Sequence, residues 1–159
     1  MNTNKTIESF NKHHDERYER KLKDLHGIFK DREAYEKEIK KNPIIYELYT
    51  KNLSPIRNTL TVIYPGKIGK EFYMTRGHIH KNKTPEFYIL LEGKGILLMQ
   101  NSEKVKVIKM KLGKIELIPK GYAHRIINNG NEKLKVLTIY REHNNPNYKI
   151  KFKRRFFSR

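Results

Sequence analysis

The pattern of apolar and polar residues divides this chain of 159 residues into two parts. Residues 1–42 are rich in charge and carry apolar residues at wide spacing, which is typical of amphipathic helices. We expect one helix over 6–27, ending at Gly27. A second helix is predicted over 31–42, with Asp31 near its start.

From Pro43 onward, short runs of β-branched and aromatic residues are separated by turn residues. Tight glycine-containing turns, EGKG (92–95) and NNGN (128–131), predict hairpins. Many short strands with regular turns in about a hundred residues favour a sandwich or a barrel. The runs that we interpret as strands lie within 44–50, 59–69, 86–100, 104–113, 114–121 and 124–140.

The chain is long enough for one domain with a real core. We therefore predict a mainly β protein. It has a helical N-terminal decoration over 1–42, one β-barrel over 43–153 and a basic tail over 154–159. No run approaches the ~18 apolar residues of a membrane span, and residues 1–20 do not read as a secretion signal. We expect a soluble, cytoplasmic protein without a membrane partner.

Composition narrows the chemistry. The chain has no cysteine, so any metal must be held by His, Asp or Glu. It carries 35 basic and 17 acidic residues, a net charge of +18, which could attract nucleic acid, an anionic membrane or a small anion. The lysines are spread along the chain, which argues against a dedicated nucleic-acid patch. The densest cluster, 148–159, is interpreted as a basic strand or frayed end, with nucleic-acid contact as the minority reading.

The stretch TRGHIHKNKTPEFY (75–88) places two histidines one residue apart. Alternate residues of a strand share a face, so His78 and His80 can bind one ion. Residues 81–85 are predicted to turn, and Glu86 then opens an apolar strand. A buried carboxylate is costly without a partner, and a metal would compensate it. Taken alone, this pattern fits a metal site and an exposed hairpin equally well.

The stretch GKIELIPKGYAHRIIN (113–128) shifts that balance. It reads G-x5-P-x-G-x2-H-x3-N, and its Gly113 and Pro119/Gly121 turns can direct His124 inward. Three imidazoles and one carboxylate suit Fe(II), Mn(II), Ni(II) or Zn(II), with positions left open for substrate or water. The metal reading is therefore favoured. Adjacent residues of a helix face different ways, so His13 and His14 make a poor chelating pair. We interpret both of them, and His26, as surface residues.

These two segments resemble the two motifs of the cupin superfamily, and E-x6-G from Glu86 to Gly93 agrees as well. Two departures lie in the first motif. Phe72 stands where the usual glycine precedes His78 by six residues, and five residues separate His80 from Glu86. The resemblance implies a single cupin barrel, a double-stranded β-helix or jelly roll, with N-terminal helices.

The longer spacer resembles one branch, the cupin-type phosphoglucose isomerases of archaea and some bacteria. The stretches YPGKIGKEF, TRGHIH, EFYILLEGKG and IPKGYAHRIIN share that look over roughly residues 25–148. The resemblance implies a homodimeric enzyme of glycolysis and gluconeogenesis that interconverts glucose 6-phosphate and fructose 6-phosphate with one divalent metal per subunit. We expect Fe(II), with Mn(II), Ni(II) and Zn(II) as alternatives. The implied metal ligands are His78, His80, Glu86 and His124.

An aldose–ketose isomerase moves a proton between C1 and C2 through an enediol and needs a base near both carbons. Glu86 is the best-placed carboxylate, as base, ligand or both, and a hydride shift is the alternative route. Tyr88 shares its strand face and either serves the sugar or fills the barrel. By the resemblance, Thr61, Thr75 and the Gly77 backbone bind phosphate, and Tyr140 contacts the substrate; Arg76 ranks lower because it alternates outward.

One further departure follows Tyr140. The family has a substrate histidine shortly downstream, before an Asp-Tyr pair. Here the run is REHNNPNY, so Tyr148 aligns while Pro146 takes the histidine position, and His143 could substitute from a shifted loop.

Other functions fit the same residues. A cupin Fe(II) dioxygenase would use the same ligands, and a non-catalytic metallo-cupin could bind a sugar phosphate as a sensor; mannose 6-phosphate would fit as well as glucose 6-phosphate. The apolar strand PIIYELY (43–49) could supply a homodimer interface.

Overall fold

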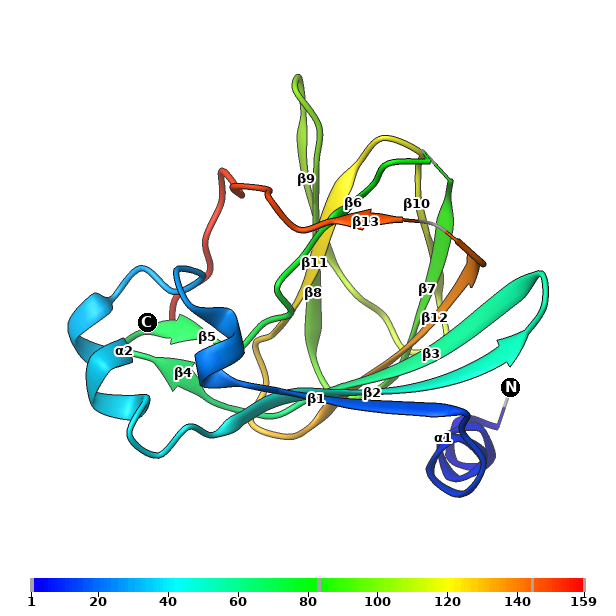
Figure 1. Cartoon of the computed structure of the whole chain (residues 1–159), viewed down its shortest axis with the longest axis horizontal. Coiled ribbons are helices and arrows are strands. Elements are labelled where there is room, and N and C mark those ends of the chain that lie inside the picture. Colours follow the sequence, from blue (N-terminus) through cyan, green and yellow to red (C-terminus); the bar gives the residue numbers. More distant parts are fainter. Residues whose placement is uncertain (1, 83, 144, 159) are drawn as a thin grey trace.

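The computed structural model describes residues 2–82, 84–143 and 145–158, and most of its strands belong to two antiparallel sheets (Figure 1). The larger has six strands in the order β1-β2-β3-β12-β7-β10. Their bounds are β1 Glu16–Lys21, β2 Ile44–Leu53, β3 Ile56–Ile63, β12 Leu134–Arg141, β7 Glu86–Glu92 and β10 Ile115–Ile118.

The second sheet has the order β11-β8-β9, with β11 Ala123–Asn128, β8 Gly95–Gln100 and β9 Val105–Lys109. Two pairs of short strands complete the set: β4 Lys67–Ile68 with β5 Glu71–Phe72, and β6 Ile79–His80 with β13 Pro146–Asn147. Isolated bridges, Met74 to Ile127 and His78 to His124, attach the segment before β6 to β11. The sheets therefore form the expected jelly-roll barrel, with His78 and His80 beside strand β11, which carries His124.

The barrel is apolar on the inside and partly covered on the outside. On β7, Tyr88 and Leu90 face the main core, whereas Ile89 and Leu91 belong to a second cluster with Leu60 and Leu137. Helix α1 (Thr3–Lys12) contributes Ile7 and Phe10 to that second cluster. Both faces of β7 are thus buried, which explains its nearly continuous apolar run.

The helix predicted over 6–27 is wrong beyond its first turns. Helix α1 ends at Lys12, and the same charged segment continues as strand β1 and a 3₁₀ turn, η1 (Leu22–Leu25). Strand β1 pairs with β2 over six residues, and Arg17 reaches across to Glu47 at 2.5 Å. Helical propensity is overridden here because the neighbouring strand offers a complete hydrogen-bonding edge.

The second helix is confirmed in a shorter form, α2 (Arg32–Glu38). Asp31 is its N-cap, and its carboxylate accepts a hydrogen bond from the Ala34 N–H at 2.9 Å. The predicted turns at Gly113 and Gly121 are also found, each with φ above +70°. The boundary of the helical decoration at residue 42 stays a prediction.

The basic C-terminal cluster 148–159 (the tail) is bound to the barrel over its described residues, so the frayed-end interpretation is wrong. The Gln100 side chain donates to the Lys151 carbonyl at 2.8 Å and accepts from the Lys153 N–H at 2.9 Å. Further on, the Phe72 N–H donates to the Phe156 carbonyl at 3.1 Å. The tail runs from β13 along the barrel towards β5 (Figure 1).

Strand β2, which contains most of the apolar segment 43–49, lies between β1 and β3 and is hydrogen-bonded on both sides. It therefore offers no free edge for a partner subunit, and the homodimer interface expected from this strand stays a prediction. Among the described residues, no helix is long and apolar enough to cross a membrane.

The tail is anchored by a buried ion pair, which gives a stability prediction. Glu71 is 1 % exposed and accepts from Arg155 at 2.8 Å and from the Lys30 N–H at 2.9 Å. We expect Arg155→Ala to lower the free energy of unfolding by about 1–3 kcal/mol, because it leaves the carboxylate under-satisfied. Urea denaturation measures this. The control Arg154→Ala, at an exposed position, should change it by less than about 0.5 kcal/mol, and equal losses in both variants would contradict the anchor.

Candidate metal centre and substrate pocket

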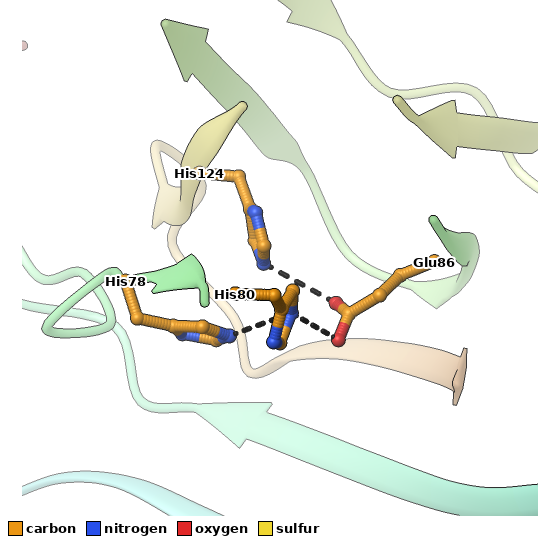
Figure 2. A group of neighbouring side chains, drawn as sticks. All are labelled: His78, His80, Glu86 and His124. Carbon is orange, nitrogen blue, oxygen red and sulfur yellow. Dashed lines mark hydrogen bonds and ion pairs between the residues drawn. The ribbon is translucent and has the colours of Figure 1, made fainter. Parts of the chain in front are cut away.

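Four side chains from three parts of the barrel converge on one point (Figure 2). His78 and His80 come from the segment of β6, Glu86 opens β7, and His124 lies in β11. Their ligand atoms all lie within 4.8 Å of one another. The predicted ligand set is therefore brought together. The predicted turn over 81–85 includes residue 83, which lies outside the described residues.

The distances between donor atoms suit one shared cation. The Nε2 atoms of His78 and His80 are 3.1 Å apart, and Glu86 places its two oxygens 2.5 Å from His80 Nε2 and 3.2 Å from His124 Nε2. Ligands at about 2.1 Å from one ion, at right angles, lie about 3.0 Å apart. The donor set, three imidazoles and a carboxylate, is one that Fe(II), Mn(II), Ni(II) and Zn(II) accept.

Burial and charge put two of these groups in the state that a metal requires. Burial, together with the neighbouring His124 and His80, lowers the pKa of His78 to about 3, so its imidazole is neutral. Burial alone would raise the pKa of Glu86, but hydrogen bonds with His124 and His80 outweigh it, and the pKa lies below the usual range. A neutral imidazole and an ionised carboxylate are both ready to donate electron pairs.

Tyr88 lies against this cluster. Its ring meets the His124 ring edge-on at a centroid distance of 5.5 Å. Burial, then the charge of Glu86 and a hydrogen bond with it, raise the pKa of Tyr88 well above its ordinary value. The phenol therefore keeps its proton at neutral pH, next to the carboxylate.

A pocket of about 330 Å³ opens beside the cluster, on the inner side of the large sheet. It has both hydroxyl-bearing and charged walls. The predicted site residues that line it are Thr61, His78, Glu86, Tyr88 and Tyr140.

Two predicted phosphate residues, Thr75 and Gly77, are not among those lining residues. The Thr75 hydroxyl accepts a hydrogen bond from the Ile126 N–H at 3.1 Å. Gly77 is buried at φ +77°, and a Cβ there would lie 2.6 Å from the Phe152 ring. Glycine is thus required at this position by tail packing as well as by backbone conformation.

Arg125, directly after His124, holds the backbone segment that precedes His78 and His80. Its guanidinium is buried, donates to the Arg76 carbonyl at 2.6 Å and stacks on Phe152 at 4.1 Å. Burial lowers its pKa to about 10, which still leaves it charged at neutral pH. The side chain of Arg76 is exposed, as its position in the alternation predicted.

The departure from the family's sequence pattern after Tyr140 affects the wall of the pocket. Pro146 and Tyr148 both line it, and the Tyr148 ring lies 5.6 Å from that of His78. His143 is exposed, has a positive φ of 58° and is not among the lining residues. The expected substitution of His143 for the family's histidine is therefore absent from the described pocket.

Sequence reasoning missed much of the pocket wall. The additional lining residues are Glu16, Tyr18, Arg20, Leu48, Thr50, Arg57, Thr59 and Thr138. Most come from β1, β2 and β3, where the register places Thr50 opposite Thr59 and Thr59 opposite Thr138. Thr59 could have been found from the sequence, because it lies two residues before Thr61 and shares its strand face. The pairing with Thr50 depends on strand register, which no local pattern reveals.

The barrel and its buried His₃Glu cluster define a metal-binding cupin. The fold is similar to oxalate decarboxylase from Bacillus subtilis, with a TM-score of 0.52 and 22% identity over 60% of this chain and 25% of that chain. It is also similar to the Lactobacillus farciminis oxalate decarboxylase, with a TM-score of 0.53 over 65% of this chain and 30% of that one. At this identity the likeness concerns the fold.

Within the cupins, the sequence is more specific. Residues 19–156 match the glucose-6-phosphate isomerase (GPI) family model, and the chain belongs to that family. It is 42% identical to glucose-6-phosphate isomerase of Thermococcus gammatolerans over 127 residues, which are 76% of this chain and 67% of that protein. The Pyrococcus furiosus enzyme is 40% identical over 128 residues, 76% of this chain and 68% of that protein.

We predict that His124→Ala weakens divalent-metal affinity by about 100-fold or more. Even outer-sphere partners of a metal cost about 10- to 100-fold when they are removed, and His124 is a direct ligand candidate. Titration calorimetry with Mn(II) and metal analysis of the purified variant measure the loss. His26→Ala, at an exposed position far from the cluster, is the control; full metal content in the His124 variant would remove this residue from the ligand set.

Proposed function

We propose that this chain interconverts glucose 6-phosphate and fructose 6-phosphate, with one divalent metal held by His78, His80, Glu86 and His124. The observation that carries the proposal is the buried His₃Glu cluster at a pocket lined with hydroxyl groups, in a chain of the glucose-6-phosphate isomerase family. We further propose Fe(II) as the resident ion and the cytoplasm as the compartment.

A divalent cation at the cluster would polarise the sugar carbonyl and stabilise developing negative charge on its oxygen. The chain itself would handle the proton. Glu86 is ionised and lines the pocket beside the cluster, so it is our candidate base for the transfer between C1 and C2. Tyr88 keeps its proton and donates it to Glu86, so its phenol oxygen is left to accept a hydrogen bond from a sugar hydroxyl.

At the other end of the sugar, the phosphate needs hydrogen-bond donors and positive charge. Thr61 and the cations Arg20 and Arg57 line the pocket, where Arg57 also forms an ion pair with Glu16. We propose that Thr75 and the Gly77 backbone complete this end when substrate is bound, and that Tyr140 contacts the sugar between the two ends. The net charge of +18 favours the approach of a dianionic sugar phosphate.

We expect the purified protein to convert fructose 6-phosphate to glucose 6-phosphate, to lose that activity on chelation, and to regain it with at least one of Fe(II), Mn(II), Ni(II) and Zn(II). A coupled assay after stepwise add-back measures this. Stoichiometric metal binding without isomerisation would count against the proposed reaction, and mannose 6-phosphate in the same assay defines the substrate.

The route of the proton gives a separate prediction. If Glu86 carries it through an enediol, the reaction in D₂O places solvent deuterium on the transferred position, because a carboxylic acid exchanges its proton with solvent. Mass spectrometry of the product reports the label. A product free of deuterium at full conversion would favour the hydride shift and leave Glu86 as a ligand only.

We also propose that the enzyme is a homodimer whose interface includes the β10 end of the large sheet. Strand β10 is the last strand in the sheet order, and Leu117 and Ile115 are 50% and 59% exposed, beside Phe87 of β7. Leu117→Lys should convert a dimer to a monomer, measured by light scattering after gel filtration. Leu53→Lys, at an exposed site on the β2–β3 turn, is the matched control.

A further inference from the structure

A chain of hydroxyl groups crosses the floor of the pocket and ends on Tyr140. The Thr50 and Thr59 hydroxyl oxygens are 2.9 Å apart, and the Thr59 hydroxyl lies 3.0 Å from the Tyr140 phenol oxygen. Thr50 and Thr59 are only 4% and 6% exposed. All three residues line the pocket.

The strand register builds this chain. Thr50 of β2 stands opposite Thr59 of β3, and β12 follows on the other side of β3, with Tyr140 opposite Arg57. Tyr140 is in turn opposite Glu86 of β7. The phenol therefore lies between the hydroxyl chain on one side and the strand that carries the candidate base on the other.

Threonine is an unusual choice for such buried sites unless its hydroxyl is used, because a valine of the same shape would avoid the cost of burying a polar group. Here each hydroxyl has a partner, so that cost is offset. The Thr59 hydroxyl contacts two oxygens, and it can donate its one proton to either of them while a lone pair accepts from the other.

We propose that Thr59, supported by Thr50, is a positioning residue that fixes the Tyr140 phenol towards the sugar. This inference rests on the proposed isomerase function. Thr59 occupies one hydrogen-bonding position of the phenol, which leaves the other positions for a ligand in the pocket that Tyr140 lines.

The chain also allows the phenol to change roles by rotation of its hydroxyl groups, with every covalent O–H bond kept. If Thr50 donates to Thr59 and Thr59 to Tyr140, the phenol proton is available to a sugar oxygen. If every hydroxyl turns about its C–O bond, the phenol donates to Thr59 and accepts from the sugar instead. Aldose–ketose isomerisation exchanges carbonyl and hydroxyl between neighbouring oxygens, so a contact that can both donate and accept fits both sugars.

The test is a double-mutant cycle with Thr59→Val and Tyr140→Phe, on protein loaded with metal. We expect Thr59→Val to lower kcat/KM by about 3- to 10-fold, the equivalent of one net hydrogen bond, with unchanged metal content. In the Tyr140→Phe background the same change should have an effect of less than about 2-fold, because its partner is already absent. Thr59→Ser, which keeps the hydroxyl, should restore most of the activity.

A packing role would give a different result. If Thr59→Val multiplies the loss of Tyr140→Phe by its full single-mutant factor, or if Thr59→Ser is as impaired as Thr59→Val, the positioning role is overturned. Wild-type activity in Thr59→Val would overturn it as well.

A binding measurement separates this inference from the proposed reaction. Sorbitol 6-phosphate is an open-chain sugar phosphate analogue that cannot isomerise, and calorimetry gives its affinity for the same four proteins. We expect a loss of about 3- to 10-fold for Thr59→Val that disappears in the Tyr140→Phe background. If the wild type binds this polyol but does not isomerise fructose 6-phosphate, the proposed reaction is wrong. The binding cycle still tests the positioning role of Thr59 in that case. Additive losses of affinity in the cycle reject the positioning role.

Discussion

The Glu86 carboxylate is 2% exposed and ionised, and its position between two imidazoles is the constraint on which the rest of the site depends. An isolated buried carboxylate would be neutralised by a raised pKa, because a charge loses its hydration in the barrel interior. The contacts with His80 and His124 reverse that tendency. They require two separate segments to meet β7 within about an ångström of the right place, so the two sheets must close accurately.

The described tail contributes to that accuracy. Phe152 packs against Gly77 and stacks on Arg125, and Arg125 holds the Arg76 carbonyl. The backbone immediately before His78 is therefore held in place by Phe152, which follows the last strand, β13, in the chain. A side chain at position 77 would be strained by the φ of +77°, and its Cβ would push the Phe152 ring away. Residues that never touch the pocket thus hold its metal ligands in place.

The site residues fall into two groups with different physics. At the cluster, burial and mutual repulsion keep His78 neutral, while the histidines keep Glu86 charged. Along the rest of the pocket, hydroxyl groups of threonine and tyrosine prevail, with cations at the wall. This division suits an open-chain sugar phosphate. The cluster offers electron-pair donors to a cation near the reacting carbons, and the threonine and tyrosine hydroxyls can donate to or accept from the sugar hydroxyls. The cations attract the phosphate.

Local spacing in the sequence predicted the four clustered side chains and the mainly β barrel. The segments 92–95 and 128–131 connect strands of different sheets, β7 to β8 and β11 to β12, so the hairpins predicted there are wrong. Alternation in a strand puts His78 and His80 on one side, and the glycine turns at 113 and 121 orient His124. Three features became visible in the folded chain alone: residues 16–21 form a strand, the tail is docked, and Thr50, Thr59 and Tyr140 meet. Those outcomes depend on pairing between segments distant in sequence. Strand register and long-range packing cannot be recognised from the residue pattern of a single segment. At residues 16–21 the free edge of β2 overrides the helical propensity of the segment.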